Sequence, residues 1–229
     1  MIISFSGLDG SGKTTQIKLL LKYFKEKNLS IDSIYNYTKD IRYHHSSELL
    51  FFYKQFASKN VIHTRFRLNS DENNNFMKII EYSEFDNYYL AEATALQGYL
   101  DYRKMDDYVN SPLLNDDRIL IYDRYFYDEI AFKSIFGCSF NRMQEMYDNC
   151  KIPTYAFYIK ISPEIAYKRN KDRDDSATTI YSNISYIAKL SNYFDQIAKR
   201  YNMITINGEL SIIEIHNEIL KIINQTNDN

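Results

Sequence analysis

The sequence predicts an α/β fold, in which helices cover both faces of a central parallel β-sheet. Apolar runs typical of buried strands alternate along the chain with segments whose apolar residues recur at helical spacing. A glycine-rich loop, residues 7–15, stands between the first strand and the first helix. Strand, loop and helix in this order, followed by further alternation, favour a parallel sheet.

The expected elements follow one another without a linker that would separate two domains. Strands are expected at residues 2–5, 31–37, 119–122, 155–161 and 203–206. Helices are expected at residues 14–27, after Ser162-Pro163, around 186–197 and around 212–222. We therefore predict one domain over residues 1–223, followed by a polar tail at 224–229.

Residues 40–98 show a different pattern. Helical periodicity is visible at 48–56 and again at 76–100, and an Asn-rich stretch at 69–75 separates the two. We interpret about 40–98 as a helical insertion that enlarges the domain.

Composition limits the classes of protein to which the chain can belong. Its 229 residues suit one domain with a well-buried core. A net charge of −2 argues against a dedicated nucleic-acid binder, and no apolar run is long enough to span a membrane. The two cysteines, Cys138 and Cys150, are too few for a disulfide framework and show no metal-ligand spacing. These features, with no room for a signal peptide, predict a cytoplasmic protein.

Residues 7–15 match the pattern of a phosphate-binding loop, with Gly7 and Gly12 spaced around four residues before Lys13 and Thr14. Lys13 is expected to reach the β- and γ-phosphates of ATP, and the Thr14 hydroxyl to bind Mg²⁺. The candidate cofactor-binding residues are Gly7, Leu8, Asp9, Gly10, Ser11, Gly12, Lys13, Thr14 and Thr15. The alternative is a glycine turn that joins strand to helix without a nucleotide.

Asp123-Arg124-Tyr125 directly follows the strand expected at 119–122. An acid at the carboxyl end of a parallel strand beside a phosphate loop can hold Mg²⁺, directly or through water. Arg124 would then stabilise charge on the transferring phosphoryl group. The alternative for Asp123 is a structural one, since acids at strand ends often cap the following helix.

A charged run begins at Lys168 and contains Arg169 and Arg173. It predicts a lid, at about 168–178, whose arginines contact the triphosphate and exclude water. The alternative is a solvated, charged helix end. The phosphate loop has no basic residue at positions 10 and 11, so further positive charge has to come from elsewhere.

The chain resembles the thymidylate kinase family of nucleoside monophosphate kinases over about two-thirds of its length. Four blocks carry the resemblance in order: residues 5–15, Asp123-Arg124-Tyr125 with Ala131-Phe132, residues 162–173 and residues 204–222. The first two blocks are specific. The resemblance implies transfer of a phosphoryl group from ATP, with Mg²⁺, to a nucleoside monophosphate, with dTMP as the leading acceptor.

The same resemblance implies roles for individual residues. Asp9 would lie near the acceptor's phosphate, its sugar hydroxyl or the metal, and Arg124 would bridge the donor and acceptor phosphates. Arg169 and Arg173 would be the lid arginines. Counting back from Asp123 places a base-stacking aromatic at Tyr99 and a base-contacting arginine at Arg103, while Phe132 would line the same pocket. Core packing is the alternative for Tyr99 and Phe132.

Departures from the family pattern fall on the acceptor side. Family members carry an Arg-Glu-Pro-Gly-like stretch after their second strand, whose arginine holds the acceptor phosphate, whereas residues 35–40 lack it. Lys39 or Arg42 would have to substitute for this arginine. Asp128 and Lys133 stand where the family usually has Ser and Gln.

Other functions therefore stay open. One is a kinase of another acceptor, such as a deoxynucleoside or a modified nucleotide. A second is a nucleotide-binding regulator without acceptor turnover, for which the insertion would be the partner surface. Family members are commonly dimers, so the resemblance also implies a homodimer.

Overall fold

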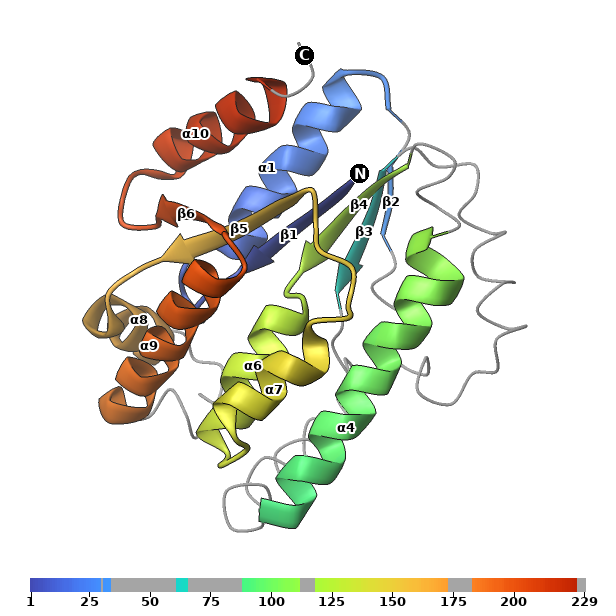
Figure 1. Ribbon diagram of the computed structural model, residues 1–229. Helices are drawn as coiled ribbons and strands as arrows, with labels where there is room; N and C mark the ends of the chain where they lie inside the picture. Colours follow the sequence, from blue (N-terminus) through green and yellow to red (C-terminus); the bar gives the residue numbers. More distant parts are fainter. Residues whose placement is uncertain (30, 34–60, 66–87, 112–117, 173–182, 226–229) are drawn as a thin grey trace.

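The computed structural model describes residues 1–29, 31–33, 61–65, 88–111, 118–172 and 183–225, which form an α/β structure (Figure 1). The strands are β1 (Ile2–Ser6), β2 (Ile31–Ser33), β3 (Val61–Arg65), β4 (Ile119–Asp123), β5 (Tyr155–Lys160) and β6 (Ile204–Asn207). The helices are α1 (Lys13–Glu26), α4 (Tyr88–Met105), the π-helix η2 (Asp106–Asn110), α6 (Phe126–Ile135), α7 (Phe140–Tyr147), α8 (Pro163–Lys171), α9 (Ile184–Arg200) and α10 (Ile212–Gln225).

The six strands form one parallel sheet in the order β2-β3-β4-β1-β5-β6. This confirms the predicted α/β fold. Phe5 of β1 is in register with Asp123 of β4. Because the carboxyl ends of parallel strands meet at one edge of a sheet, the loop after β1 and the segment after β4 lie beside each other.

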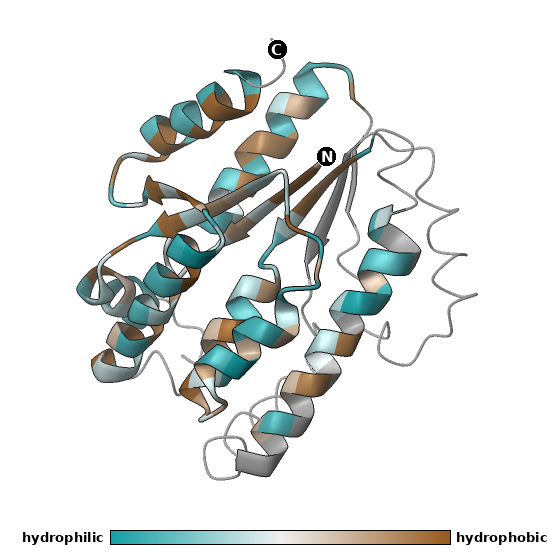
Figure 2. Cartoon of the chain, in the orientation of Figure 1, coloured by the Kyte–Doolittle hydropathy of each residue, from teal (hydrophilic) through white to brown (hydrophobic). Residues whose placement is uncertain are grey.

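Alternating side chains on the central strands divide the interior into two cores, one on each face of the sheet. Ile3 and Phe5 of β1 pack in the core that α1 and α10 cover, whereas Ile2 packs in the core under α4, α6, α7 and α9. Apolar colouring of the strands and of the helix sides that face them shows this arrangement (Figure 2). Both faces of the central strands are therefore buried, as expected for a parallel sheet covered on both sides.

The prediction of a wholly helical insertion over 40–98 is wrong at residues 61–65. These residues form β3, an interior strand between β2 and β4. The sequence Val-Ile-His-Thr-Arg ends in three polar residues, which interrupt the apolar run by which the other strands were recognised. The helix expected at 48–56 lies outside the described residues, and only the part of the second expected helix from Tyr88 onward is described, as α4.

The other expected elements agree with the structure to within a few residues. α8 begins at Pro163, as the Ser-Pro pair predicted. The stripe of α9 buries Leu190, Phe194 and Ile197. The helix expected around 212–222 is α10, which buries Ile215, Ile219 and Ile223. The strand expected at 31–37 is described only from Ile31 to Ser33 and pairs with β3, not with β4.

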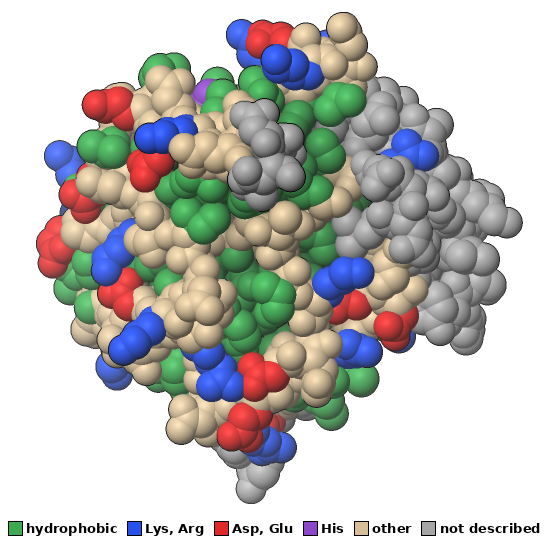
Figure 3. Space-filling model, turned by 45° about the horizontal axis from the view of Figure 1, so that its top comes forward, with side chains coloured by type: hydrophobic (Ala, Val, Ile, Leu, Met, Phe, Trp, Pro, Cys, Tyr) green, Lys and Arg blue, Asp and Glu red, His purple; other side chains and the backbone are tan. Residues whose placement is uncertain are grey.

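One face of the molecule carries charged side chains of both signs. Figure 3 shows acidic and basic side chains interspersed on the face it presents, with no large area of one sign. Among the described helices, none is long and apolar enough to cross a membrane.

Candidate functional site

The phosphate loop follows β1 in a conformation that depends on glycine. Gly7, Gly10 and Gly12 have φ angles of +136°, +83° and +95°, which side chains of L-residues disfavour. A Cβ atom on Gly7 would lie 2.5 Å from the Ile159 carbonyl oxygen, so the loop also approaches β5 closely there. α1 begins immediately afterwards, at Lys13, and its N-terminus faces the loop. The predicted strand–loop–helix unit is thus present.

Lys13 lies at the floor of this loop, with its side chain buried. Its Nζ donates to the carbonyl oxygens of Gly7 and Leu8, both at 2.8 Å, and to Ser11 Oγ at 3.3 Å. Burial, together with the positive charge of Arg124, lowers the pKa of Lys13 to about 8. The buried cation of Lys13 and the N-terminus of α1 thus lie together at the loop, and both favour an anion.

Thr14 and Asp123, the two candidate metal ligands, lie together. Thr14 Oγ1 donates to Asp123 Oδ2 at 3.0 Å, and the Asp123 side chain is buried at the end of β4. A hydroxyl and a carboxylate oxygen are ligands that suit Mg²⁺. The residues present therefore fit a magnesium ion held between the phosphate loop and the end of β4. Thr15, the last residue of the loop, is exposed.

Arg124 lies between two carboxylates. Its guanidinium ion-pairs with Asp9 of the phosphate loop and, at 2.9 Å, with Asp128 of α6. Its carbon Cζ lies 5.2 Å from the centre of the Phe132 ring, in a cation–π contact. The structure thus brings together Asp9, Arg124 and Phe132, three residues singled out in the sequence for different reasons.

Asp128 belongs to the same cluster, although the sequence marked it only as a departure from the family pattern. Its carboxyl Oδ2 accepts a hydrogen bond from the Tyr125 backbone N–H at 3.3 Å, which completes a capping box at the start of α6. Burial raises the pKa of Asp128, and the charges of Arg124 and Lys13 oppose that rise.

The base of the predicted lid rests on the phosphate loop. Arg169 Nη1 donates to the Gly10 carbonyl oxygen at 2.9 Å, and Asn170 Nδ2 donates to the Asp9 carbonyl oxygen at 2.8 Å. A Cβ atom on Gly10 would lie 3.1 Å from Arg169 Cβ, so a larger residue at position 10 would push α8 away. Asn170 had no sequence signal of its own. Arg173 lies outside the described residues.

Tyr99 and Arg103, the two residues predicted to contact the base, have different surroundings in the structure. Tyr99 of α4 is half-buried and meets Tyr147 edge to face, with ring centres 5.6 Å apart. Arg103 donates to the Asn149 carbonyl oxygen at 2.6 Å and pairs with Asp107 at 3.7 Å. Neither contact of Arg103 belongs to the phosphate loop or to Arg124, so the structure does not join it to the cluster.

On the acceptor side, the strand beside β4 is β3, and its last residue, Arg65, is in register with Asp123. Sequence reasoning assigned the missing arginine motif to residues 35–40 instead. Lys39, the proposed substitute, lies outside the described residues. Recognition of residues 61–65 as a strand would have drawn attention to Arg65, because the carboxyl ends of parallel strands are where ligands bind in open α/β sheets.

An exposed apolar patch lies at the start of α10, beside α1. The side chains of Leu210, Ile212 and Ile213 are 41%, 55% and 60% exposed. Gln16 Nε2 of α1 donates to the Ile212 carbonyl oxygen at 3.0 Å. This hydrogen bond connects the patch to α1, the helix that follows the phosphate loop. The helical pattern around 212–222 did not indicate that the isoleucines at its start are exposed.

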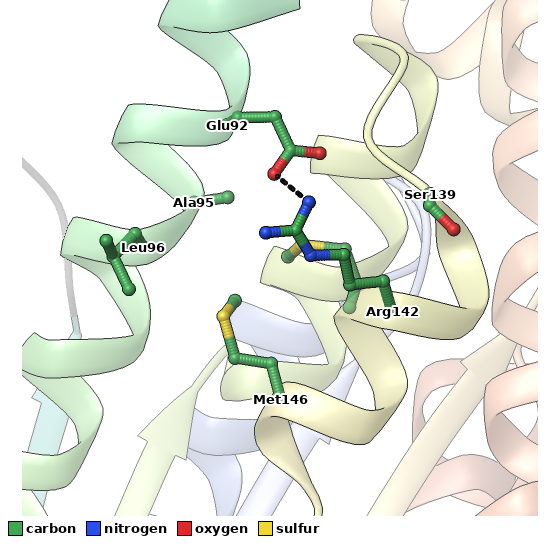
Figure 4. Close-up of a pocket in the computed structure, with 7 residues that line it drawn as sticks. Glu92, Ala95, Leu96, Ser139, Arg142 and Met146 are labelled. Carbon is green, nitrogen blue, oxygen red and sulfur yellow. Dashed lines mark ion pairs between the residues drawn. The ribbon is translucent and has the colours of Figure 1, made fainter.

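A separate groove of about 240 Å³ lies between α4 and α7 (Figure 4). An ion pair between Glu92 and Arg142, at 3.3 Å, crosses it. The remaining lining is mostly apolar: Ala95, Leu96, Ser139, Met143 and Met146. None of the candidate site residues lines this groove, so it is distinct from the cluster at the phosphate loop.

Comparison with known proteins gives consistent similarities. Residues 58–219 match the sequence model of the thymidylate kinase family. A probable thymidylate kinase of Methanocaldococcus jannaschii is 27% identical over 96% of this chain and 94% of its own length. Probable thymidylate kinase 2 of Saccharolobus solfataricus is 24% identical over 100% of this chain and 98% of its own. In fold, the crystal structure of thymidylate kinase from Ehrlichia chaffeensis aligns with a TM-score of 0.60 at 20% identity, covering 97% of this chain and 98% of that one.

Proposed function

Because this chain belongs to the thymidylate kinase family of nucleotide kinases, we propose that it transfers the γ-phosphoryl group of ATP to dTMP in the presence of Mg²⁺. The observation that carries the proposal is the meeting of Lys13, Thr14 and Asp9 of the phosphate loop with Asp123 and Arg124 at one edge of the sheet. This arrangement supplies fixed cations and metal ligands where a phosphoryl group would pass.

In this proposal the protein stabilises charge and forms no covalent intermediate. Lys13 and Arg124 neutralise negative charge that develops on the transferring group, and Arg169 and Arg173 do so from the lid side. Thr14 and Asp123 would hold Mg²⁺, which would supply positive charge against that of the triphosphate. Asp9 restrains Arg124 from the loop side through their ion pair.

For the donor base, we assign the exposed patch of Leu210, Ile212 and Ile213. These apolar side chains lie beside the start of α1, and a flat purine ring gains by covering such a surface. Glu209, next to the patch, accepts a hydrogen bond from the Ser162 backbone N–H at 2.8 Å, which joins this loop to the start of α8. The donor site thus lies between α1, α8 and α10.

For the acceptor, we assign Arg65 to the phosphate and Tyr99 and Phe132 to the base. Arg65 is in register with Asp123, and Phe132 contacts Arg124. Arg103 would have to exchange its contact with Asn149 in order to reach a base. We also propose that Lys39 is a second cation that contacts the acceptor phosphate.

We propose further that the protein is a homodimer and lies in the cytoplasm.

A kinase of another acceptor is the second candidate, and Asp128 is the observation that favours it. This carboxylate adds negative charge to the acceptor side of Arg124, where an acceptor without a phosphate would meet less repulsion. Both candidates use the same donor site.

A panel of acceptors separates the two. ADP release is measured with dTMP, other nucleoside monophosphates and deoxynucleosides, each with ATP and Mg²⁺. We expect dTMP to give the highest kcat/KM, and a higher value for a nucleoside would favour the second candidate.

Lys13→Ala should abolish turnover with every acceptor while the protein stays folded. Tight ATP binding without turnover by the unaltered chain would instead indicate a regulatory protein. Light scattering measures the oligomeric state.

A further inference from the structure

We propose that Asp128 is a positioning residue that holds Arg124 in the orientation in which it can contact the transferring phosphoryl group. This inference rests on the proposed kinase function and deepens it. The family that the chain resembles usually has serine at this position, so the carboxylate is a feature of this chain.

Asp128 is itself held rigidly. It lies in the first turn of α6, its side chain is only 5% exposed, and each of its two carboxylate oxygens accepts a different hydrogen bond. One oxygen, Oδ2, binds the Tyr125 backbone N–H, and the other, Oδ1, binds Arg124 Nη1 at 2.9 Å. The contact that anchors the carboxylate to the helix is therefore separate from the contact that orients the arginine.

Arg124 needs such an anchor because its backbone lies outside regular structure. Its φ angle is +75°, in the left-handed region, and it precedes α6. An arginine side chain has about 2 kcal/mol of rotamer entropy to lose when it becomes fixed. An anchor that fixes the side chain before substrates bind removes that cost from the reaction.

The two carboxylates beside Arg124 differ in their surroundings. Asp9 lies on the phosphate loop with a side chain 23% exposed, whereas that of Asp128 is 5% exposed. A guanidinium presents several N–H donors in a planar fork, which suits the oxygens of a phosphoryl group as well as carboxylates. The Phe132 ring covers a flat side of the guanidinium. Asp128 and Phe132 thus fix the orientation of Arg124 from the protein side.

The first test is Asp128→Asn, which keeps the shape and one acceptor oxygen but removes the charge. Charge-assisted hydrogen bonds contribute enough that we expect kcat to fall about tenfold or more. KM for both nucleotides should stay within about twofold, because the orienting effect acts on the transition state. Asp128→Ser, whose hydroxyl is too short to reach the guanidinium, should lose kcat similarly. Asp148→Asn, which removes another Asp–Arg pair (Asp148–Arg200 at 2.5 Å) outside the site, should keep wild-type kcat.

The second test is a double-mutant cycle with Arg124→Ala, measured by single turnover. If Asp128 acts through Arg124, Asp128→Asn should change the rate less than about twofold in this background. An equal loss in both backgrounds would show that Asp128 acts structurally, and an unchanged kcat in the single variants would also overturn the proposal. Turnover of dTMP by the unaltered protein tests the kinase function independently, and the cycle is run with whichever acceptor the panel identifies.

Discussion

Thr14 Oγ1 donates a hydrogen bond to Asp123 Oδ2 across 3.0 Å, which joins the start of α1 to the end of β4. The register of the two central parallel strands produces this contact, because Phe5 pairs with Asp123 and the phosphate loop begins two residues after Phe5. Two side-chain oxygen atoms from residues 109 apart in sequence thereby lie within hydrogen-bond distance of each other. The arrangement predicts that both are needed for magnesium.

Thr14→Val removes the hydroxyl and keeps the shape of the side chain. We expect the Mg²⁺ concentration for half-maximal activity to rise about tenfold, since loss of one oxygen weakens the metal site. The measurement is initial rate against Mg²⁺ at fixed ATP. Thr205→Val, a matched change at an exposed position of β6, should leave the magnesium curve unchanged. If Thr14→Val gave the wild-type curve, its hydroxyl would have no role at the metal.

The lowered pKa of Lys13 predicts that ATP binding is accompanied by proton uptake. Its pKa is about 8 in the folded protein, against an ordinary value of 10.5. Phosphate oxygens favour the charged ammonium and should raise this pKa, so ATP binding near pH 9 should take up a proton. Calorimetry in two buffers of different ionisation enthalpy measures the uptake. At pH 7, where Lys13 is already charged, the uptake should be absent.

Lys13→Met is the control for this linkage, because it removes the titrating group without adding a charge. The variant should show no proton uptake at pH 9, and uptake equal to wild type would assign the proton to another group.

The lowered pKa of Lys13 also affects the free energy of unfolding. Between about pH 8 and 10.5 the folded state binds fewer protons than the unfolded state, so the stability contribution of Lys13 should rise with pH in that window.

The sequence was sufficient to predict that the phosphate loop lies beside Asp123 and Arg124, because glycine spacing and strand-end polar residues are local patterns. Gly7 to Thr14 and Asp123-Arg124 were predicted this way, and the structure brings them together. β3 was missed because a strand with three polar residues does not give an apolar run. Without this strand, only residues 35–40 were considered for the missing arginine motif, and Arg65 at the end of β3 was overlooked.

Contacts that depend on side-chain direction could not be read from spacing. An interval counted along the chain selected Arg103, but it does not say which way a helical side chain points, and here Arg103 bonds to Asn149. Arg124 and Asp128 are four residues apart, yet Arg124 precedes the helix, so the rule for pairs within helices did not apply. The contact arises instead from the left-handed backbone at Arg124.

A buried carboxylate, Asp106, joins α4 and η2 to the segment after β4. Its Oδ2 accepts from the Lys151 backbone N–H at 2.8 Å. Its Oδ1 accepts from Asn110 Nδ2 at 2.7 Å and from the Tyr125 hydroxyl at 3.3 Å. Tyr125 directly follows Arg124, so this network fixes the end of α4 relative to the candidate site.

Asp106→Ala should destabilise the protein by about 3 kcal/mol, because it leaves buried donors without their acceptor. Urea unfolding followed by circular dichroism measures the loss. Asp107→Ala is the matched control one residue further along: its side chain is 58% exposed and pairs with Arg103 at 3.7 Å, so we expect less than about 0.5 kcal/mol. Asp106→Asn, which keeps one acceptor oxygen, should lie between the two. Equal losses for the Asp106 and Asp107 variants would mean that the buried network contributes no more than a surface ion pair.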